Sequence, residues 1–247
     1  MGLPLRRKFE VCLANRWSGC CPQAVSLTHV RYQRGDLLGH ALSWFSLLPV
    51  FIALGGFMSH FIFRRELQAM FFALGLCVNE VINQVIKELA HEARPLTCEA
   101  LEMCDSNGWP SSHSQYMCFF SMYCTLLVTR RLQFADEFRR TFVALLPWPF
   151  ALTVMYSRVY LGYHTTPQII AGGSLGLLFG AGWFFLMDNW VSDWFPWLED
   201  TAICQYLRIK DSSHIPDVIG FEYKNSREAR QNAAANPSRS SEKVSQD

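Results

Sequence analysis

The segment QIIAGGSLGLLFGAGWFFLM (168–187) decides the fold class, because its twenty positions hold no charged residue. A helix needs about 20 mostly apolar residues to cross the hydrocarbon core of a membrane. Four more apolar blocks precede it, at 37–63, 68–86, 114–129 and 141–157. The blocks 114–129 and 141–157 are short, so we expect each to gain an interfacial turn. The sequence therefore predicts an all-α, polytopic membrane helix bundle with about five transmembrane helices.

A soluble helical protein with buried helices is the alternative. Five apolar blocks within about 150 residues, with hardly a charge inside them, favour the membrane. The whole chain has 247 residues, of which 50% are hydrophobic, and a net charge of +1. This charge gives no indication of a nucleic-acid-binding protein.

The polar residues lie at the two ends of the chain and predict four parts. Residues 1–36 are expected to form an N-terminal interfacial segment and show no signal peptide. Residues 37–187 form the transmembrane core. Residues 188–224 form an interfacial segment, because 188–200 holds three tryptophans among acidic residues. Residues 225–247 have almost nothing to bury and are expected to be disordered.

Five spans place alternate connections on opposite sides of the membrane. The loops 64–67 and 130–140 are rich in arginine and share one side, while 87–113 and 158–167 share the other. The positive-inside tendency makes the first side cytosolic, so the second faces a lumen. Six basic residues in 1–36 argue for the reverse orientation. The two polar loops share one side in either case.

The first candidate site element is the end of the apolar block at 67–95. Polar side chains recur there at helical spacing, at Glu80, Asn83, Lys87, His91 and Arg94. Such residues share one helix face, and we expect this helix to continue to Arg94, before Pro95. Glu80 needs a partner inside the membrane, and Lys87 on the same face is the natural candidate. The alternative is a structural role, in which the cations at this helix end extend their charged groups to the membrane surface.

The second element is GWPSSHSQ (108–115), which leads into the third apolar block. Backbone N–H groups at a helix start bind oxyanions, and Ser111 and Ser112 add hydroxyl donors. His113 offers a group that titrates near neutral pH and can transfer a proton. Alone, the motif is also ordinary helix-capping sequence.

The third element is SRVYLGYHTTPQ (157–168). Arg158 can bind an oxyanion through two parallel N–H bonds, and the His164 imidazole can attack phosphorus. Thr166 and Pro167 fit the N-cap and first-turn positions of the last helix. Taken singly, the arginine and the histidine could equally be structural residues at the membrane surface.

Together, the three elements place cations, histidines and serines on one side of the membrane. Few free carboxylates accompany them, and the sequence shows no cluster of metal ligands. Phosphoryl transfer spreads charge over three oxygens, and a cationic pocket stabilises that charge without metal. We therefore expect a phosphate or pyrophosphate ester as substrate, and no cofactor.

The ordered motifs resemble the phosphatidic acid phosphatase type 2 superfamily. They are Lys87 followed by Arg94-Pro95, then PSSH at 110–113, then Ser157-Arg158 followed by His164. The stretches VNEVINQVIK (78–87), PSSHSQ (110–115), YSRVYLGYHT (156–165) and IPDVIGFEY (215–223) resemble the members that act on dolichyl diphosphate. The resemblance implies an endoplasmic reticulum membrane protein with its active site at the luminal border. Its implied partner is a polyprenyl (dolichyl) diphosphate lipid.

The resemblance also implies a role for each motif residue. His164 is the nucleophile, which forms a phosphohistidine, and His113 protonates the leaving oxygen. The phosphate oxygens are held by Lys87, Arg94, Ser111, Ser112 and Arg158, with the backbone N–H groups of 111–113. No metal takes part.

Two positions depart from the family pattern. Ser112 replaces a glycine, and Gln168 replaces the aspartate that usually holds the nucleophilic histidine. A neutral amide can accept from an imidazole N–H, but it stabilises an imidazolium less than a carboxylate does. Gln168 therefore leaves two alternatives besides a dolichyl diphosphate phosphatase. One is a broader lipid phosphate phosphatase, and the other is a non-catalytic protein that binds polyprenyl phosphates.

Overall fold

The computed structural model describes residues 23–25, 30–97, 101, 106–134, 136–215 and 217–235. Four helical stretches in these ranges are long and apolar enough to cross a membrane: Leu37–Arg64, Leu67–Ala90, Glu137–Tyr160 and Thr166–Glu199. Their outward positions carry exposed apolar side chains, such as Val81, Leu89 and Leu178. Lipid can cover such a surface, whereas water would oppose it. The prediction of a polytopic membrane helix bundle is confirmed.

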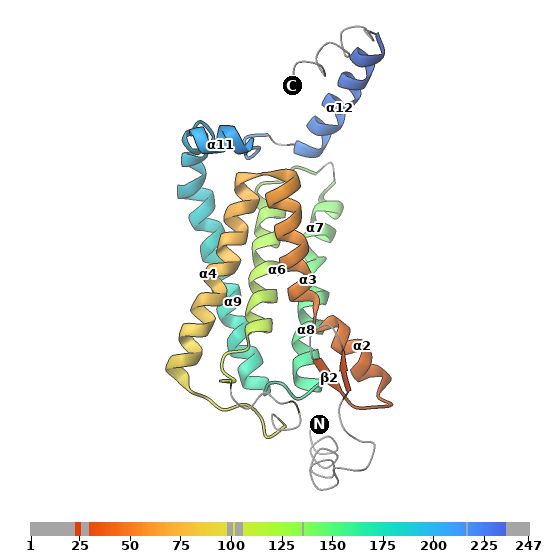
Figure 1. Ribbon diagram of the computed structural model, residues 1–247, viewed down its shortest axis with the longest axis vertical. Coiled ribbons are helices and arrows are strands. Elements are labelled where there is room, and N and C mark those ends of the chain that lie inside the picture. Colours follow the sequence, from red (N-terminus) through yellow and green to blue (C-terminus); the bar gives the residue numbers. More distant parts are fainter. Residues whose placement is uncertain are drawn as a thin grey trace.

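The first stretch contains helices α2 (Leu37–Phe45) and α3 (Leu48–Phe57) and the π-helical turn η1 (Met58–Arg64). It is followed by α4 (Leu67–Ala90) and α6 (Ser112–Arg130). Next come α7 (Glu137–Leu145) and α8 (Pro147–Tyr160), which form one span broken at a proline, and α9 (Thr166–Leu186). These helices run along the length of the bundle (Figure 1).

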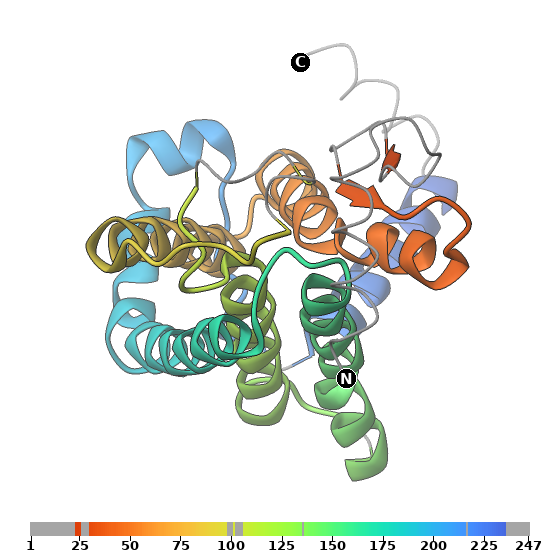
Figure 2. The ribbon, with the colours of Figure 1, turned by 90° about the horizontal axis from the view of Figure 1, so that it is seen from below.

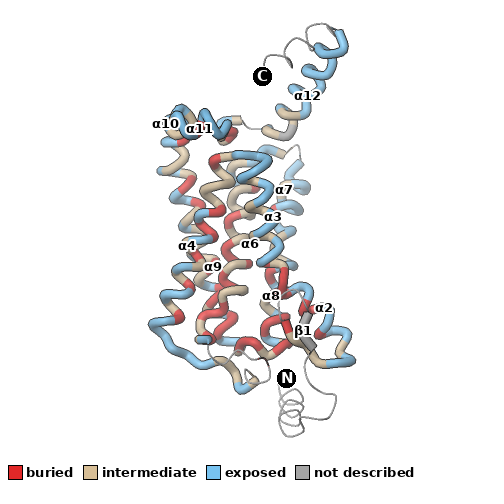
Figure 3. Tube along the Cα trace, in the orientation of Figure 1, coloured by how far each residue is buried: buried red, intermediate tan, exposed pale blue. Residues whose placement is uncertain are grey.

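Helix α6 also runs along the bundle, although it is not one of the four stretches that are long and apolar enough to cross a membrane. It contacts α4, α7, α8 and α9 and lies between them when the bundle is viewed along its length (Figure 2). Buried positions concentrate along α6 and on the parts of its neighbours that face it (Figure 3). Because protein rather than lipid surrounds α6, its serine and glutamine side chains find partners inside the bundle. Gln115, for example, donates to Asn79 and accepts from Asn83.

Glycines on α9 allow it to approach the backbone of α6. A Cβ atom at Gly172 would lie 2.4 Å from the carbonyl oxygen of Ser111, the N-cap of α6. At Gly176 and Gly180 it would lie 2.2 Å and 2.7 Å from carbonyl oxygens farther along α6. Side chains cannot occupy such positions without moving the helices apart. This stripe of small residues explains why an apolar span contains so many glycines.

Outside the bundle, β1 (Gln23–Val25) and β2 (Val30–Tyr32) form a small antiparallel sheet that the all-α prediction did not include. After α9 the chain forms η2 (Met187–Val191), η3 (Ser192–Trp194), α10 (Phe195–Glu199), α11 (Ala202–Leu207) and α12 (Val218–Ala235). Three exposed tryptophans lie here, Trp190, Trp194 and Trp197. The interfacial location of 188–224 stays a prediction.

The tail differs from the expectation of disorder over residues 225–235, which form part of α12. The exposed stretch contains four alanines and two arginines, which favour a helix even without a packed face. Residues 236–247 lie outside the described part. Most of the interfacial segment predicted at 1–36 also lies outside it.

Candidate active site

Three connections meet at one end of the bundle: the segment after α4, the segment before α6 and the turn between α8 and α9. Gly108 donates its N–H to the carbonyl oxygen of Glu92, which joins the first two. Ser111 donates its N–H to the carbonyl oxygen of Gln168, which joins the second to α9. The prediction that both polar loops share one side of the bundle is confirmed.

The His164 side chain is buried at the centre of this meeting point. Its Nδ1 atom lies 3.0 Å from the carbonyl oxygen of Gly108 and 3.3 Å from Oε1 of Gln168. Both oxygens are acceptors, so Nδ1 carries the hydrogen and Nε2 keeps its lone pair. Nε2 faces the Arg94 guanidinium, with Nη1 3.5 Å away. A neutral imidazole in this tautomer can act as a nucleophile through Nε2.

The environment of His164 favours the neutral ring. Burial, followed by the positive charges of Arg158 and Arg94, lowers the pKa of His164 to about 2. The ring is therefore unprotonated at neutral pH and does not need to lose a proton before it attacks.

Gln168 is fully buried and uses its whole amide. Its Oε1 atom accepts from the backbone N–H of Thr165, and its Nε2 donates to Oε1 of Glu92 at 2.9 Å and to the carbonyl oxygen of Ala93 at 3.1 Å. Thr165 and Gln168 form a capping box, so Thr165 is the N-cap. The prediction that Thr166 caps this helix is wrong, because Gln168 is the third residue of the helix and the cap therefore lies three positions before it, at Thr165.

Arg158 and Arg94 approach the site from two elements. Arg158 donates to the Ser46 hydroxyl, and its guanidinium lies over the ring of Tyr163, 3.9 Å from the centroid. Arg94 donates to the carbonyl oxygen of Tyr163 and to Ser106. Among the described residues, neither arginine forms an ion pair with a carboxylate. Arg158 is buried and Arg94 is half-buried, and such cations without a carboxylate partner attract an anion.

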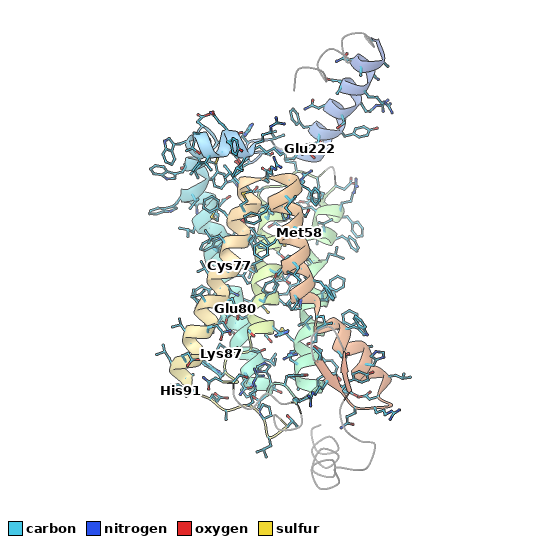
Figure 4. All side chains as sticks on the ribbon, in the orientation of Figure 1. Met58, Cys77, Glu80, Lys87, His91 and Glu222 are labelled. Carbon is cyan, nitrogen blue, oxygen red and sulfur yellow. The ribbon has the colours of Figure 1, made fainter. Side chains whose placement is uncertain are left out.

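The predicted polar stripe on the second span is only partly correct. Helix α4 ends at Ala90, and His91 adopts a left-handed conformation (φ 48°) that turns the chain away from the helix axis. Glu80, Lys87 and His91 follow one another toward this end (Figure 4). Arg94 therefore reaches the site from the connection and not from the helix face.

No direct ion pair joins Glu80 to Lys87 among the described residues, although the charge of Glu80 acts on the Lys87 amine. Glu80 accepts a hydrogen bond of 2.6 Å from Gln84, one turn along the same helix, which is within easier reach. Lys87 is buried near the active-site end, where its charge acts on His164. Its amine thus remains available for a ligand.

The PSSH motif starts α6, with Ser111 as N-cap, Ser112 as the first residue and His113 as the second. The Ser111 side chain does not cap the helix, so the N–H groups of the first turn stay open in the described structure. The prediction that the Ser111 N–H binds a phosphate oxygen does not fit the structure, because this N–H donates to the carbonyl oxygen of Gln168. His113 lies among the charges of Arg158, Lys87 and Arg94 and near His164.

Within the described residues, no group of three or more histidine, cysteine or acidic side chains gathers that could hold a metal ion. Metal-independent chemistry stays a prediction. The sequence motifs did not reveal Glu92, Gly108, Tyr163 or Ser46 as site residues. Their contacts depend on loop conformation and, for Ser46, on a helix 112 positions away.

The model of the PAP2 superfamily matches residues 68–192, which include all of these motifs. The chain belongs to this superfamily. PAP2 phosphatases are hydrolases, and the fold makes this chain a multi-pass membrane member. Lipid phosphate phosphatase gamma of Arabidopsis thaliana is 53% identical over 209 residues, which cover 84% of this chain and 92% of that protein.

Two further relatives have a different name. Dolichyldiphosphatase 1 of Homo sapiens is 40% identical over 81% of this chain and 86% of its own length. Dolichyldiphosphatase of Saccharomyces cerevisiae is 36% identical over 65% of this chain and 68% of its own. Among solved structures, a transmembrane PAP2 type phosphatidylglycerolphosphate phosphatase from Bacillus subtilis has a TM-score of 0.48 at 22% identity, over 78% of this chain and 88% of that one.

Proposed function

We propose that this PAP2 protein hydrolyses dolichyl diphosphate to dolichyl phosphate and inorganic phosphate. One observation carries the proposal: the Nδ1 hydrogen of His164 is held by Gly108, so that Nε2 faces Arg94 in a pocket of cations. This arrangement supports a nucleophile aimed at a group with several negative oxygens. The relatives named dolichyldiphosphatase, similar over most of the chain, support the substrate.

In the first step Nε2 of His164 attacks the terminal phosphorus. A P–N bond forms and the P–O bond to the dolichyl phosphate breaks, while His113, in its protonated form, gives its proton to the leaving oxygen. The negative charge of the bound diphosphate favours that protonated form. Lys87, Arg94 and Arg158, with the hydroxyls of Ser111 and Ser112, hold the phosphoryl oxygens. The N–H groups that start α6 add further donors.

In the second step water attacks the phosphohistidine. The new P–O bond replaces the P–N bond, His113 accepts the proton of the water, and orthophosphate leaves. Gly108 and Gln168 hold the Nδ1 hydrogen throughout, which stabilises the charge that the phosphorylated ring carries. The product, a polyprenyl monophosphate, is the lipid carrier used in protein N-glycosylation.

We also propose that the site faces the lumen of the endoplasmic reticulum. Arginine-rich connections lie at the opposite end of the bundle, at Arg64–Arg65 and Arg130–Arg131, and the positive-inside tendency makes that end cytosolic. A cysteine introduced beside the site, accessible to a membrane-impermeant reagent in sealed microsomes only after permeabilisation, would support this orientation. Labelling in intact microsomes would contradict it.

A phosphate-release assay with the purified chain tests the substrate. We expect dolichyl diphosphate to be hydrolysed in preference to dolichyl phosphate, phosphatidate and sphingosine phosphate. EDTA should leave the rate unchanged, and His164→Ala should abolish release and the trapping of acid-labile phosphate on the protein. Hydrolysis of the other lipids without dolichyl diphosphate would contradict the proposed substrate.

A broader lipid phosphate phosphatase is the second candidate. The Arabidopsis relative named lipid phosphate phosphatase gamma, with 53% identity, favours it. The same assay separates the two, because a broad enzyme would hydrolyse phosphatidate and dolichyl diphosphate at similar kcat/KM. An intact chain that binds polyprenyl phosphate without releasing phosphate would instead identify a non-catalytic binding protein.

A further inference from the structure

Glu92 contacts both groups that hold the nucleophilic histidine. Its carbonyl oxygen accepts from the N–H of Gly108 at 2.7 Å, and the Gly108 carbonyl oxygen lies beside Nδ1 of His164. Its carboxylate accepts from Nε2 of Gln168 at 2.9 Å, and the Gln168 carbonyl oxygen lies on the other side of Nδ1. One residue therefore joins the two supports of the His164 ring.

The link through Gln168 has a chemical consequence. A carboxylate that accepts from an amide NH₂ polarises the amide, which makes its carbonyl oxygen a stronger acceptor. That oxygen faces the Nδ1 hydrogen of His164. In this way a negative charge on Glu92 favours a positive imidazole, although Gln168 itself is neutral.

The charges around His164 otherwise have one sign. Arg94 comes from the connection after α4, Lys87 from α4 and Arg158 from α8, and His113 lies at the start of α6. In the described structure, Glu92 is the carboxylate that hydrogen bonds connect to the ring through Gln168. A cationic ring is formed when His164 is phosphorylated, so a compensating charge is most useful at that stage.

We propose that Glu92 is a positioning residue for the His164 nucleophile, acting through Gln168 and supplying the negative charge that the amide lacks. This inference rests on the proposed phosphohistidine chemistry. It differs from that chemistry in assigning a role to Glu92, one of the six residues between Lys87 and Arg94 that the first motif leaves unspecified. The alternative is a purely structural role. Glu92 is exposed to solvent, and its carboxylate would then only help the connection to fold.

Steady-state kinetics with the purified full chain and dolichyl diphosphate test the charge. Glu92→Gln keeps an acceptor for Gln168 and removes the charge, so we expect kcat to fall about fivefold with little change in KM. Glu92→Ala also removes the acceptor and should lower kcat about tenfold. Glu88→Gln is the matched control, because Glu88 is exposed on the last turns of α4, and should stay within about twofold of wild type.

An exchange of the two side chains tests the path through Gln168. Gln168→Glu places two carboxylates together and should lower kcat by more than tenfold. Adding Glu92→Gln to this variant restores one carboxylate and one amide, and we expect kcat to recover at least about fivefold. Because relief of the repulsion between the two carboxylates is part of this recovery, the exchange tests the contact between positions 92 and 168, and the single Glu92→Gln variant tests the role of the charge.

Wild-type kcat in Glu92→Gln, or a double variant no better than Gln168→Glu, would overturn the inference while leaving the phosphatase intact. A wild-type chain that releases no phosphate from any of the four lipids would overturn the proposed function and this inference with it. Melting temperatures in detergent identify any variant that has lost its fold. If the other variants do not fold, kcat of the nearly isosteric Glu92→Gln variant decides whether the Glu92 charge acts on His164.

Discussion

The Nδ1 atom of His164 lies 3.0 Å from the carbonyl oxygen of Gly108, at the junction of two segments 56 positions apart. A backbone carbonyl can only accept, so this contact fixes which ring nitrogen carries the hydrogen. In a family where an aspartate usually holds the histidine, the backbone shares that task here with the Gln168 amide. Variants that disturb this junction should therefore affect catalysis more than stability.

Gly108→Ala tests the junction directly. A Cβ atom there would lie 2.7 Å from Nε2 of Gln168 and 3.0 Å from the carbonyl oxygen of Ala93, so the amide must move. We expect kcat to fall at least about tenfold, because small displacements of a nucleophile are costly. Phosphate release and the melting temperature should be measured together. Normal kcat in a folded Gly108→Ala protein would show that this contact is dispensable.

Gln168→Asp should lower activity and not raise it. An aspartate is shorter and has no donor for Glu92 or for the carbonyl oxygen of Ala93, and its charge would face the Glu92 carboxylate. We expect kcat to fall about tenfold or more, and to fall further than in Gln168→Asn, the control of equal length without the charge. A large gain over a nearly inactive wild type would instead indicate a degenerate enzyme.

Stability should decrease in mild acid because of His164. Its pKa is lowered to about 2 in the folded chain by burial and by Arg158 and Arg94, against about 6.5 when unfolded. Between these values the unfolded state binds a proton that the folded state does not, so the free energy of unfolding falls as pH falls. From pH 7 to pH 5 the loss is at most about 2 kcal/mol.

Melting temperatures in detergent at the two pH values check this prediction. His164→Asn should lose less stability between pH 7 and pH 5 than wild type, while His214→Asn, at an exposed position, should behave as wild type. Equal pH dependence in wild type and His164→Asn would show that His164 is not held in its neutral form.

Gly176→Ala should loosen the bundle. The new Cβ would lie 2.2 Å from the carbonyl oxygen of Gln115, and neither helix backbone can yield without a shift. We expect a clearly lower melting temperature and partial loss of activity, since α6 and α9 both start at the site. Gly182→Ala on the same helix has nothing within 4 Å and should be neutral or slightly stabilising. Equal melting temperatures for both variants would contradict the close approach of α6 and α9.

The helix bounds show how far the sequence could be interpreted. The apolar blocks 68–86 and 168–187 correspond to α4 (Leu67–Ala90) and α9 (Thr166–Leu186) within a few residues. Block 114–129 corresponds to α6 (Ser112–Arg130), although its modest hydropathy reflects a place inside the bundle. The prediction that the second span continues as a helix to Arg94 is wrong, because α4 ends earlier, at the left-handed conformation of His91.

The sequence by itself determined the class of membrane helix bundle, the side shared by the polar loops and the residue types of the site. These follow from segment length, hydropathy and the alternation of spans, which depend only on neighbours along the chain. Tertiary structure decided the tautomer of His164, the partners of Gln168 and the position of Glu92. Each of these depends on hydrogen bonds between loops from different helices, whose geometry is set only when α6 and α9 pack together.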